Sequence, residues 1–324
     1  MPLTLDSSYT PCRTLRSAHL QTILPTLCRR VRHDYWRRER IGTPDGDFLD
    51  LDWSGPVRSK IALLCHGLEG SSRSVYILGM ARALSKAGWS VAALNFRGCS
   101  GSPNTKIYSY HSGKSEDLDV IVRHLSGSYH DAVIALVGFS LGGNVILKYL
   151  GEQSAALGSN VVSAVVFSVP IYLAGAATKL ARLENFLYMQ RFLILLRKKI
   201  LEKERAFPGR ISTQGYASIK NFRQYDDRYI APYNGFDSAE DYWHKCSSLA
   251  FIPGITIPTL LVNSQDDPFL SPECYPNEIA RRSANFHCET PAFGGHVGFV
   301  EFNTEGLYWS ERRTIAFLED VLGS

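Results

Sequence analysis

The pentapeptide Gly-Phe-Ser-Leu-Gly at residues 138–142 has the residue types and spacing of a catalytic turn. An apolar, β-branched run over 133–137 precedes it, and a helical pattern follows it. This context predicts a sharp turn between a strand and a helix, with strained backbone at Ser140 and an exposed hydroxyl. The two glycines would be required because neighbouring backbone passes close to them. We predict that Ser140 is a nucleophile; the alternative is an ordinary strand-to-helix turn.

A serine hydroxyl becomes a good nucleophile only when a base takes its proton, and that base is commonly a histidine oriented by a carboxylate. Where the serine occupies a strand-to-helix turn, the chain order is serine, then the acid, then histidine, each in a loop after a strand. His296 lies in a Gly-Gly-His loop near the C-terminus and fits this order. We predict His296 as the base.

The acid is one of two adjacent aspartates, Asp266 and Asp267, which follow the strand predicted over 259–263. Apolar residues at 269 and 270 follow the pair, in the register that favours Asp267 as the acid. In that register Asp266 would form a hydrogen bond within its own turn. The reverse assignment remains the alternative.

The tetrahedral intermediate of such a reaction needs two hydrogen-bond donors for its oxyanion. We predict the backbone N–H of Leu141, which follows the nucleophile, and the backbone N–H of Leu68, in the Gly- and Ser-rich loop after the strand predicted over 61–65. The sequence has no His-Glu-x-x-His motif, no cysteine cluster and no phosphate-binding glycine loop. We expect no metal and no cofactor.

Strands and helices alternate along most of the chain, which predicts an α/β protein with a mostly parallel central sheet and helices on both faces. The predicted strands after the first hairpin lie at 61–65, 90–96, 133–137, 161–169, 259–263 and 285–289, and the predicted helices at 74–87, 114–125 and 307–322. Residues 34–41 and 47–53, separated by a Thr-Pro-Asp-Gly turn, predict an N-terminal antiparallel hairpin at the edge of the sheet.

Residues 171–250 interrupt the alternation and are interpreted as a helical cap insertion above Ser140. A helix is expected over 178–205, and residues 216–243 are irregular. The apolar residues of the insertion exceed what one helical face needs, so we expect some to line an acyl pocket, such as Phe186, Leu187, Phe192 and Leu193. The window 178–210 carries nine Lys/Arg against three Glu, which indicates either a solvated face or a surface that contacts lipid.

Length and composition set wider limits. The 324 residues, 45% of them hydrophobic, suit a single domain over 1–324 that includes the insertion. The net charge of +4 is too small to indicate nucleic-acid binding. Seven scattered cysteines and no visible signal peptide predict a cytoplasmic protein. Residues 1–32 are expected to wrap over the domain, and the patch 19–25 receives no function.

Six motifs together resemble the YheT-like family of α/β-hydrolases: residues 66–70, 96–101, 110–113, 138–144, 266–269 and 294–299. The patch 19–22 and residues 44–47 are similar to that family too. The resemblance covers residues 13–320 and implies an α/β-hydrolase fold, carboxylic-ester hydrolysis, and a triad of Ser140, Asp267 and His296. Acylglycerol lipases, phospholipases and alcohol acyltransferases occur in that family.

The sequence as a whole predicts a serine esterase that cleaves a small-molecule apolar acyl ester through an acyl-serine intermediate. An acyltransferase would share that intermediate and differ only in passing the acyl group to an alcohol. A protein that binds ligands without catalysis is the alternative of another class. The intact order of serine, aspartate and histidine argues against this last reading.

Overall fold

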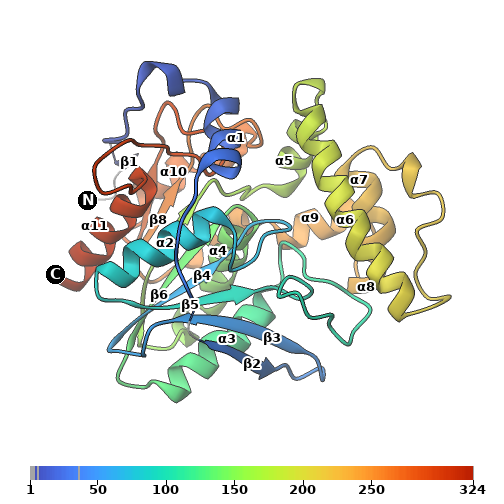
Figure 1. Cartoon of the computed structure of the whole chain (residues 1–324), viewed down its shortest axis with the longest axis horizontal. Coiled ribbons are helices and arrows are strands. Elements are labelled where there is room, and N and C mark those ends of the chain that lie inside the picture. The colour runs from blue at the N-terminus through green and yellow to red at the C-terminus, as the bar shows by residue number, and fades with distance from the viewer. Residues whose placement is uncertain (1–3, 6, 36, 324) are drawn as a thin grey trace.

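A single mixed sheet organises the fold in the computed structural model, which describes residues 4–5, 7–35 and 37–323. Within these residues nine strands follow the order β1-β9-β8-β7-β6-β4-β5-β3-β2 (Figure 1). Their bounds are β1 Thr4–Leu5, β2 Arg37–Gly42, β3 Phe48–Ser54, β4 Lys60–Cys65, β5 Ser90–Asn95, β6 Val133–Phe139, β7 Val161–Phe167, β8 Thr259–Val262 and β9 Phe286–Glu289. Neighbours from β1 to β5 are parallel, whereas β3 pairs antiparallel with both β5 and β2. The predicted mostly parallel sheet with an antiparallel N-terminal hairpin is confirmed.

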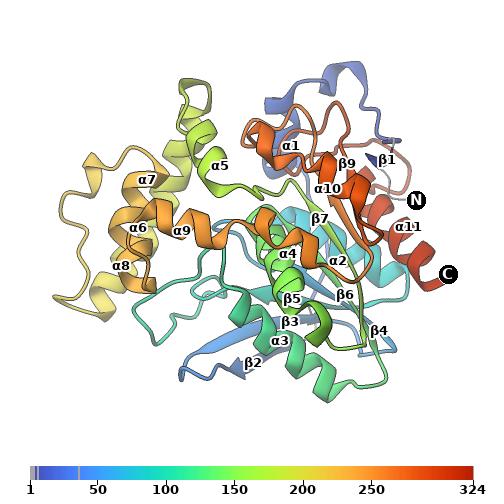
Figure 2. The same cartoon turned by 180° about the vertical axis from the view of Figure 1, so that it is seen from behind.

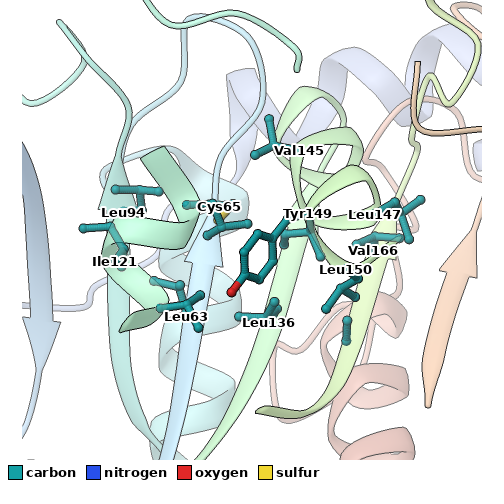
Figure 3. Close-up of a cluster of buried hydrophobic side chains, with 14 of the residues drawn as sticks. Leu63, Cys65, Leu94, Ile121, Leu136, Val145, Leu147, Tyr149, Leu150 and Val166 are labelled. Carbon is teal, nitrogen blue, oxygen red and sulfur yellow. The ribbon is translucent and has the colours of Figure 1, made fainter. Parts of the chain in front are cut away.

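Helices cover both faces of the sheet (Figures 1 and 2). One layer contains α2 (Val75–Lys86) and α11 (Trp309–Gly323), and the other contains α3 (Ser115–Ser128) and α4 (Leu141–Gln153). Along β4, Leu63 belongs to the core cluster with α3 and α4, whereas Leu64 belongs to the cluster with α2 and α11. Figure 3 shows the first cluster, with Leu63 and Leu136 beside Tyr149 of α4. Burial on both faces explains why these strands read as continuous apolar runs.

The N-terminal segment contains a helix that the sequence did not predict, α1 (Ala18–Cys28). Its buried residues are Gln21 and Pro25, so the helix lacks the apolar periodicity by which helices are recognised. The short helix α10 (Asn277–Arg282) was missed as well. Residues 1–3 and 6, which bear on the predicted lack of a signal peptide, and residue 36 of the predicted hairpin lie outside the described residues. In the described part of the chain, no helix has the length and apolar character needed to cross a membrane.

Residues 171–250, here called the cap segment, lie between β7 and β8 and form helices beside the sheet (Figure 2). These are α5 (Leu173–Leu180), α6 (Phe186–Ala206), α7 (Phe222–Tyr225), α8 (Ala231–Asn234) and α9 (Ala239–Cys246). The single helix predicted over 178–205 is therefore wrong. Arg182 is extended, and the Asn185 side chain donates hydrogen bonds to the carbonyl oxygens of Lys179 and Pro268, which fixes a break between α5 and α6.

Candidate active site

Ser140 occupies the turn between β6 and α4 with φ 51° and ψ −120°. Two close approaches explain the glycines on either side of it. A Cβ on Gly142 would lie 2.5 Å from the carbonyl oxygens of Cys65 and His66, and a Cβ on Gly138 would lie 2.8 Å from the backbone of Gly143. Only glycine fits at these positions, so the strained turn is built into the local sequence.

A chain of hydrogen bonds connects the three residues that the sequence singled out. The Nε2 atom of His296 lies 2.9 Å from Oγ of Ser140, and Nδ1 lies 2.9 Å from Oδ2 of Asp267. The backbone N–H of Phe269 donates to Oδ1 of the buried Asp267 at 2.9 Å. Because an ionised carboxylate only accepts, Nδ1 donates to Asp267 and leaves Nε2 to accept the proton of the serine hydroxyl.

Asp266 does not contact His296 through its carboxylate. Its Oδ1 accepts a hydrogen bond of 2.9 Å from the backbone N–H of Gly295, in the histidine loop. Asp266 also forms the expected hydrogen bond within its own turn, to the side chain of Ser264, and the contact with Gly295 is an additional one. Burial is the main cause of the raised pKa of Asp266. Its partner Gly295 lies 29 residues further along the chain. Asp266 thus fixes the backbone of the loop and Asp267 its imidazole.

Helix α1 holds the histidine loop from the other side. The Thr22 hydroxyl accepts a hydrogen bond from the backbone N–H of His296, and the Gln21 side-chain oxygen accepts one from Val300, both at 2.9 Å. A Cβ on Gly295 would lie 2.4 Å from the carbonyl oxygen of Ala18. The patch 19–25, to which the sequence analysis assigned no function, therefore positions the predicted base. Apart from the family resemblance of residues 19–22, its sequence signal is a short polar run, His19, Gln21 and Thr22, among apolar residues.

The loop after β4 lies directly against Ser140. A Cβ on Gly67 would lie 3.2 Å from Cβ of Ser140, and the Gly67 N–H donates to the hydroxyl of Tyr76. Leu68 and Leu141, the predicted oxyanion donors, line the same cavity as Ser140 and His296. Their positions fit the expected role, which stays a prediction.

Two cavities meet at Ser140 and His296, which line both. The inner cavity extends under the cap segment, and its apolar lining includes Leu173, Ala177, Leu180, Phe192, Leu196, Phe222, Ile230 and Phe269. The outer groove runs between α1 and α6 over the loop after β4, and its lining includes Ile23, Leu27, Leu68, Leu187, Tyr188, Arg191 and Phe192. An ester bound at Ser140 could therefore place its two halves in two separate spaces.

The four apolar residues expected in the acyl pocket have different places. Phe192 lines both cavities, and Leu187 lines the outer groove only. Phe186 is exposed, and Leu193 is buried in the core of the cap segment. The expectation fails for Phe186 and Leu193, which line neither cavity.

Polar groups also occur in the inner cavity. Burial raises the pKa of Asp226 to about 8, although its Oδ2 accepts a hydrogen bond from the Trp243 indole. Lys199 is turned inward, with Nζ 3.2 Å from Oε1 of Glu69 and 2.8 Å from Sγ of Cys99. Lys203 donates to backbone carbonyls. These two of the nine basic residues of the window 178–210 are therefore not part of an outward basic surface.

Known proteins with similar sequences and folds agree with this architecture. The family described as alpha/beta hydrolase fold matches residues 62–302. The chain is 35% identical to the protein named "Putative esterase YheT" of Escherichia coli (strain K12), over 91% of this chain and 88% of that one. It is 30% identical to phospholipase ABHD3 of Mus musculus, over 82% of this chain and 67% of that one.

A solved structure of the Pyrococcus furiosus esterase Pf2001 shares the fold, with a TM-score of 0.61 and 19% identity, covering 90% of this chain and 92% of that chain. The sheet order, the turn at Ser140 and the sequence similarity all support one family assignment. The chain belongs to the α/β-hydrolase fold family and, within it, to the YheT-like family.

Proposed function

We propose that this protein is a carboxylic ester hydrolase in which Ser140, His296 and Asp267 form the catalytic triad. The observation that carries the proposal is the unbroken hydrogen-bond chain from Asp267 through His296 to Ser140, at the point where two cavities meet. Structural serines rarely combine a strained backbone, an imidazole at 2.9 Å and an approach for substrate.

The mechanism follows from these contacts. Nε2 of His296 takes the hydroxyl proton as Oγ of Ser140 attacks the ester carbonyl, and Asp267 stabilises the imidazolium. The N–H groups of Leu68 and Leu141 would stabilise the oxyanion. Collapse of the intermediate releases the alcohol, which receives its proton from His296. A water molecule that His296 deprotonates then hydrolyses the acyl-serine.

The lining of the inner cavity favours an apolar acyl group as the part of the ester bound there. Relatives named as an esterase, a phospholipase and a monoacylglycerol lipase support the ester class. The alcohol part would extend along the outer groove, which is open between α1 and α6. This opening gives water and alcohols an approach to the acyl-serine.

Labelling by a fluorophosphonate and hydrolysis of p-nitrophenyl esters test the proposal. Ser140→Ala should abolish labelling and lower kcat by roughly 10⁴–10⁶, while the circular dichroism spectrum stays unchanged. A variant that keeps more than a few per cent of the activity would exclude Ser140 as the nucleophile. Absence of labelling and turnover in the native protein would favour a non-catalytic binding protein. Product analysis with added alcohol separates hydrolysis from acyl transfer.

A further inference from the structure

Exposed apolar side chains are concentrated at one place on the molecule. Nine large hydrophobic residues are exposed in the described part of the chain, and seven of them lie on α1 or between residues 183 and 194. We call these seven the apolar rim: Leu20, Ile23, Leu27, Leu183, Phe186, Leu187 and Ile194. Leu27 is 72% exposed and Leu187 is 79% exposed, so neither contributes to the core. A cluster of this kind marks an interaction surface.

The rim borders the entrance to the proposed active site. Leu20, Ile23 and Leu27 are spaced i, i+3, i+7 on one face of α1, and Leu187 and Ile194 share a face of α6. Ile23, Leu27 and Leu187 line the outer groove, which also contains Ser140 and His296. Nδ1 of His19 lies 3.0 Å from the Tyr188 hydroxyl, which brings the start of α1 beside the start of α6.

Cations lie on α6 and on the residues that flank α1, and the acid next to the rim, Glu184 beside Leu183, is paired with Lys179. The sequence contains no Asp or Glu over 7–33 or over 185–201. Exposed cations in these stretches include Arg16, Arg30, Arg191, Arg197 and Lys198. Arg191 lies in the outer groove between Leu187 and Ile194 and has no ion-pair partner among the residues that the structure describes. Apolar side chains next to unpaired cations are typical of helices that bind at an anionic lipid interface.

We propose that the apolar rim docks on the surface of a lipid bilayer with anionic head groups. The rim side chains enter the boundary between head groups and acyl chains, and Arg191 and its neighbours contact the phosphates. The outer groove then opens onto the bilayer, so that an ester could pass from lipid to Ser140 without crossing water; this last step rests on the proposed function. A second copy of the chain fits the rim less well, because a symmetric contact would bring cations against cations.

Flotation with vesicles tests the docking independently of catalysis. The Ser140→Ala variant is used because it cannot consume the lipid. It is mixed with phosphatidylcholine vesicles in which about one third of the lipid is phosphatidylglycerol. We expect the protein to bind, and the bound fraction should fall as the salt concentration rises. Leu20→Glu and Ile194→Glu, in exposed rim positions outside both cavities, should each weaken binding about tenfold or more. Phe302→Glu is the matched control, because Phe302 is 78% exposed and lies outside the outer groove.

Arg191→Gln tests the contribution of the cation separately from that of the apolar side chains. It should weaken binding to the anionic vesicles and leave any binding to pure phosphatidylcholine unchanged. Ile194→Glu should hydrolyse a monomeric p-nitrophenyl ester at the native rate, which distinguishes failed docking from failed catalysis. Equal binding by the rim variants and Phe302→Glu would overturn the proposal. The proposal would also be overturned if the native protein did not bind vesicles and the rim variants sedimented differently from it. That result would identify the rim as a contact between copies of the chain.

Discussion

Two adjacent carboxyl groups serve two different parts of the same loop. Asp267 accepts from the imidazole of His296, whereas Asp266 accepts from the backbone N–H of Gly295. An amide can replace a carboxylate as an acceptor for a backbone N–H, but its NH₂ group cannot accept from Nδ1 of a histidine. The two aspartates should therefore respond very differently to the same substitution.

Asp267→Asn should lower kcat by about 10⁴, the loss seen in a well-studied triad whose histidine is left in the wrong tautomer. Asp266→Asn should lower it by less than about tenfold, because the amide oxygen can still accept from Gly295. Steady-state kinetics on a p-nitrophenyl ester measures both variants, and circular dichroism confirms folding. Similar losses in the two would show that the pair acts mainly to hold the loop.

The residues at which the two cavities meet carry a sequence signal for their role, whereas the residues that hold them do not. Ser140 and His296 stand out because glycines surround them at fixed spacing and their chain order is restricted by the mechanism. Thr22 and Gln21 act through single hydrogen bonds to residues more than 270 positions away. A contact at that separation leaves no periodic signal in one sequence, so their role came only from the structure.

At the scale of elements, α1 acts as a support for the histidine loop. Thr22→Val keeps the shape of the side chain and removes the acceptor for the His296 N–H. An unsatisfied donor of this kind costs about 1–3 kcal/mol, which corresponds to a kcat lower by roughly five- to 150-fold if the whole cost falls on the transition state. Thr22 lines the outer groove but not the inner cavity, so binding of the acyl part of the ester should change little. Thr22→Ser keeps the hydroxyl and should retain most activity; a loss as large as in Thr22→Val would place the effect in packing instead.

The parallel strands were predicted well because burial on both faces leaves continuous apolar runs. The cap segment was predicted less well because distant contacts decide its breaks. Asn185 is bound to the carbonyl oxygen of Pro268, 83 residues further along the chain, and the helical pattern over 178–205 contains no trace of this.

The inner cavity should determine which acyl chains are accepted. Each methylene that enters it contributes about 0.8 kcal/mol, so kcat/KM should rise roughly fourfold per methylene along an ester series and then stop where the cavity ends. Leu196→Trp and Phe222→Trp should move that limit to shorter chains, because both residues line the inner cavity. Leu183→Trp is the control, since Leu183 is exposed. A flat series in the native protein would mean that the inner cavity does not hold the acyl chain.

At the scale of the whole molecule, a few polar contacts fasten the cap segment to the sheet layer. The Asn144 side chain of α4 donates to the carbonyl oxygens of Ser112 and Cys246 and accepts from the Ser248 N–H. Ser112 also lines the inner cavity, whose wall is mostly apolar. A titratable group buried near such a junction affects the stability of the fold as well as the site.

Asp226 is that group, and it makes stability depend on pH. Burial is the main cause that raises its pKa from 3.8 to about 8, with the exposed neighbour Asp227 adding to the rise and the Trp243 hydrogen bond opposing it. Between those two pH values the folded protein holds a proton that the unfolded chain has released. The free energy of unfolding must therefore fall as pH rises, by at most about 1.4 kcal/mol per pH unit.

Asp226→Asn removes this titration and keeps an acceptor for the Trp243 indole. The difference in unfolding free energy between variant and native protein, measured by urea titration at pH 4 to 9, should move steadily in favour of the variant from about pH 4 to about pH 8 and stay level beyond, because only the native carboxyl then changes its charge on unfolding. Asp227→Asn removes the neighbouring charge that adds to the raised pKa of Asp226, so it should reduce the pH dependence without abolishing it. A constant difference for Asp226→Asn would mean that Asp226 is already ionised in the folded protein. The cap segment would then have to supply a compensating charge or water to it.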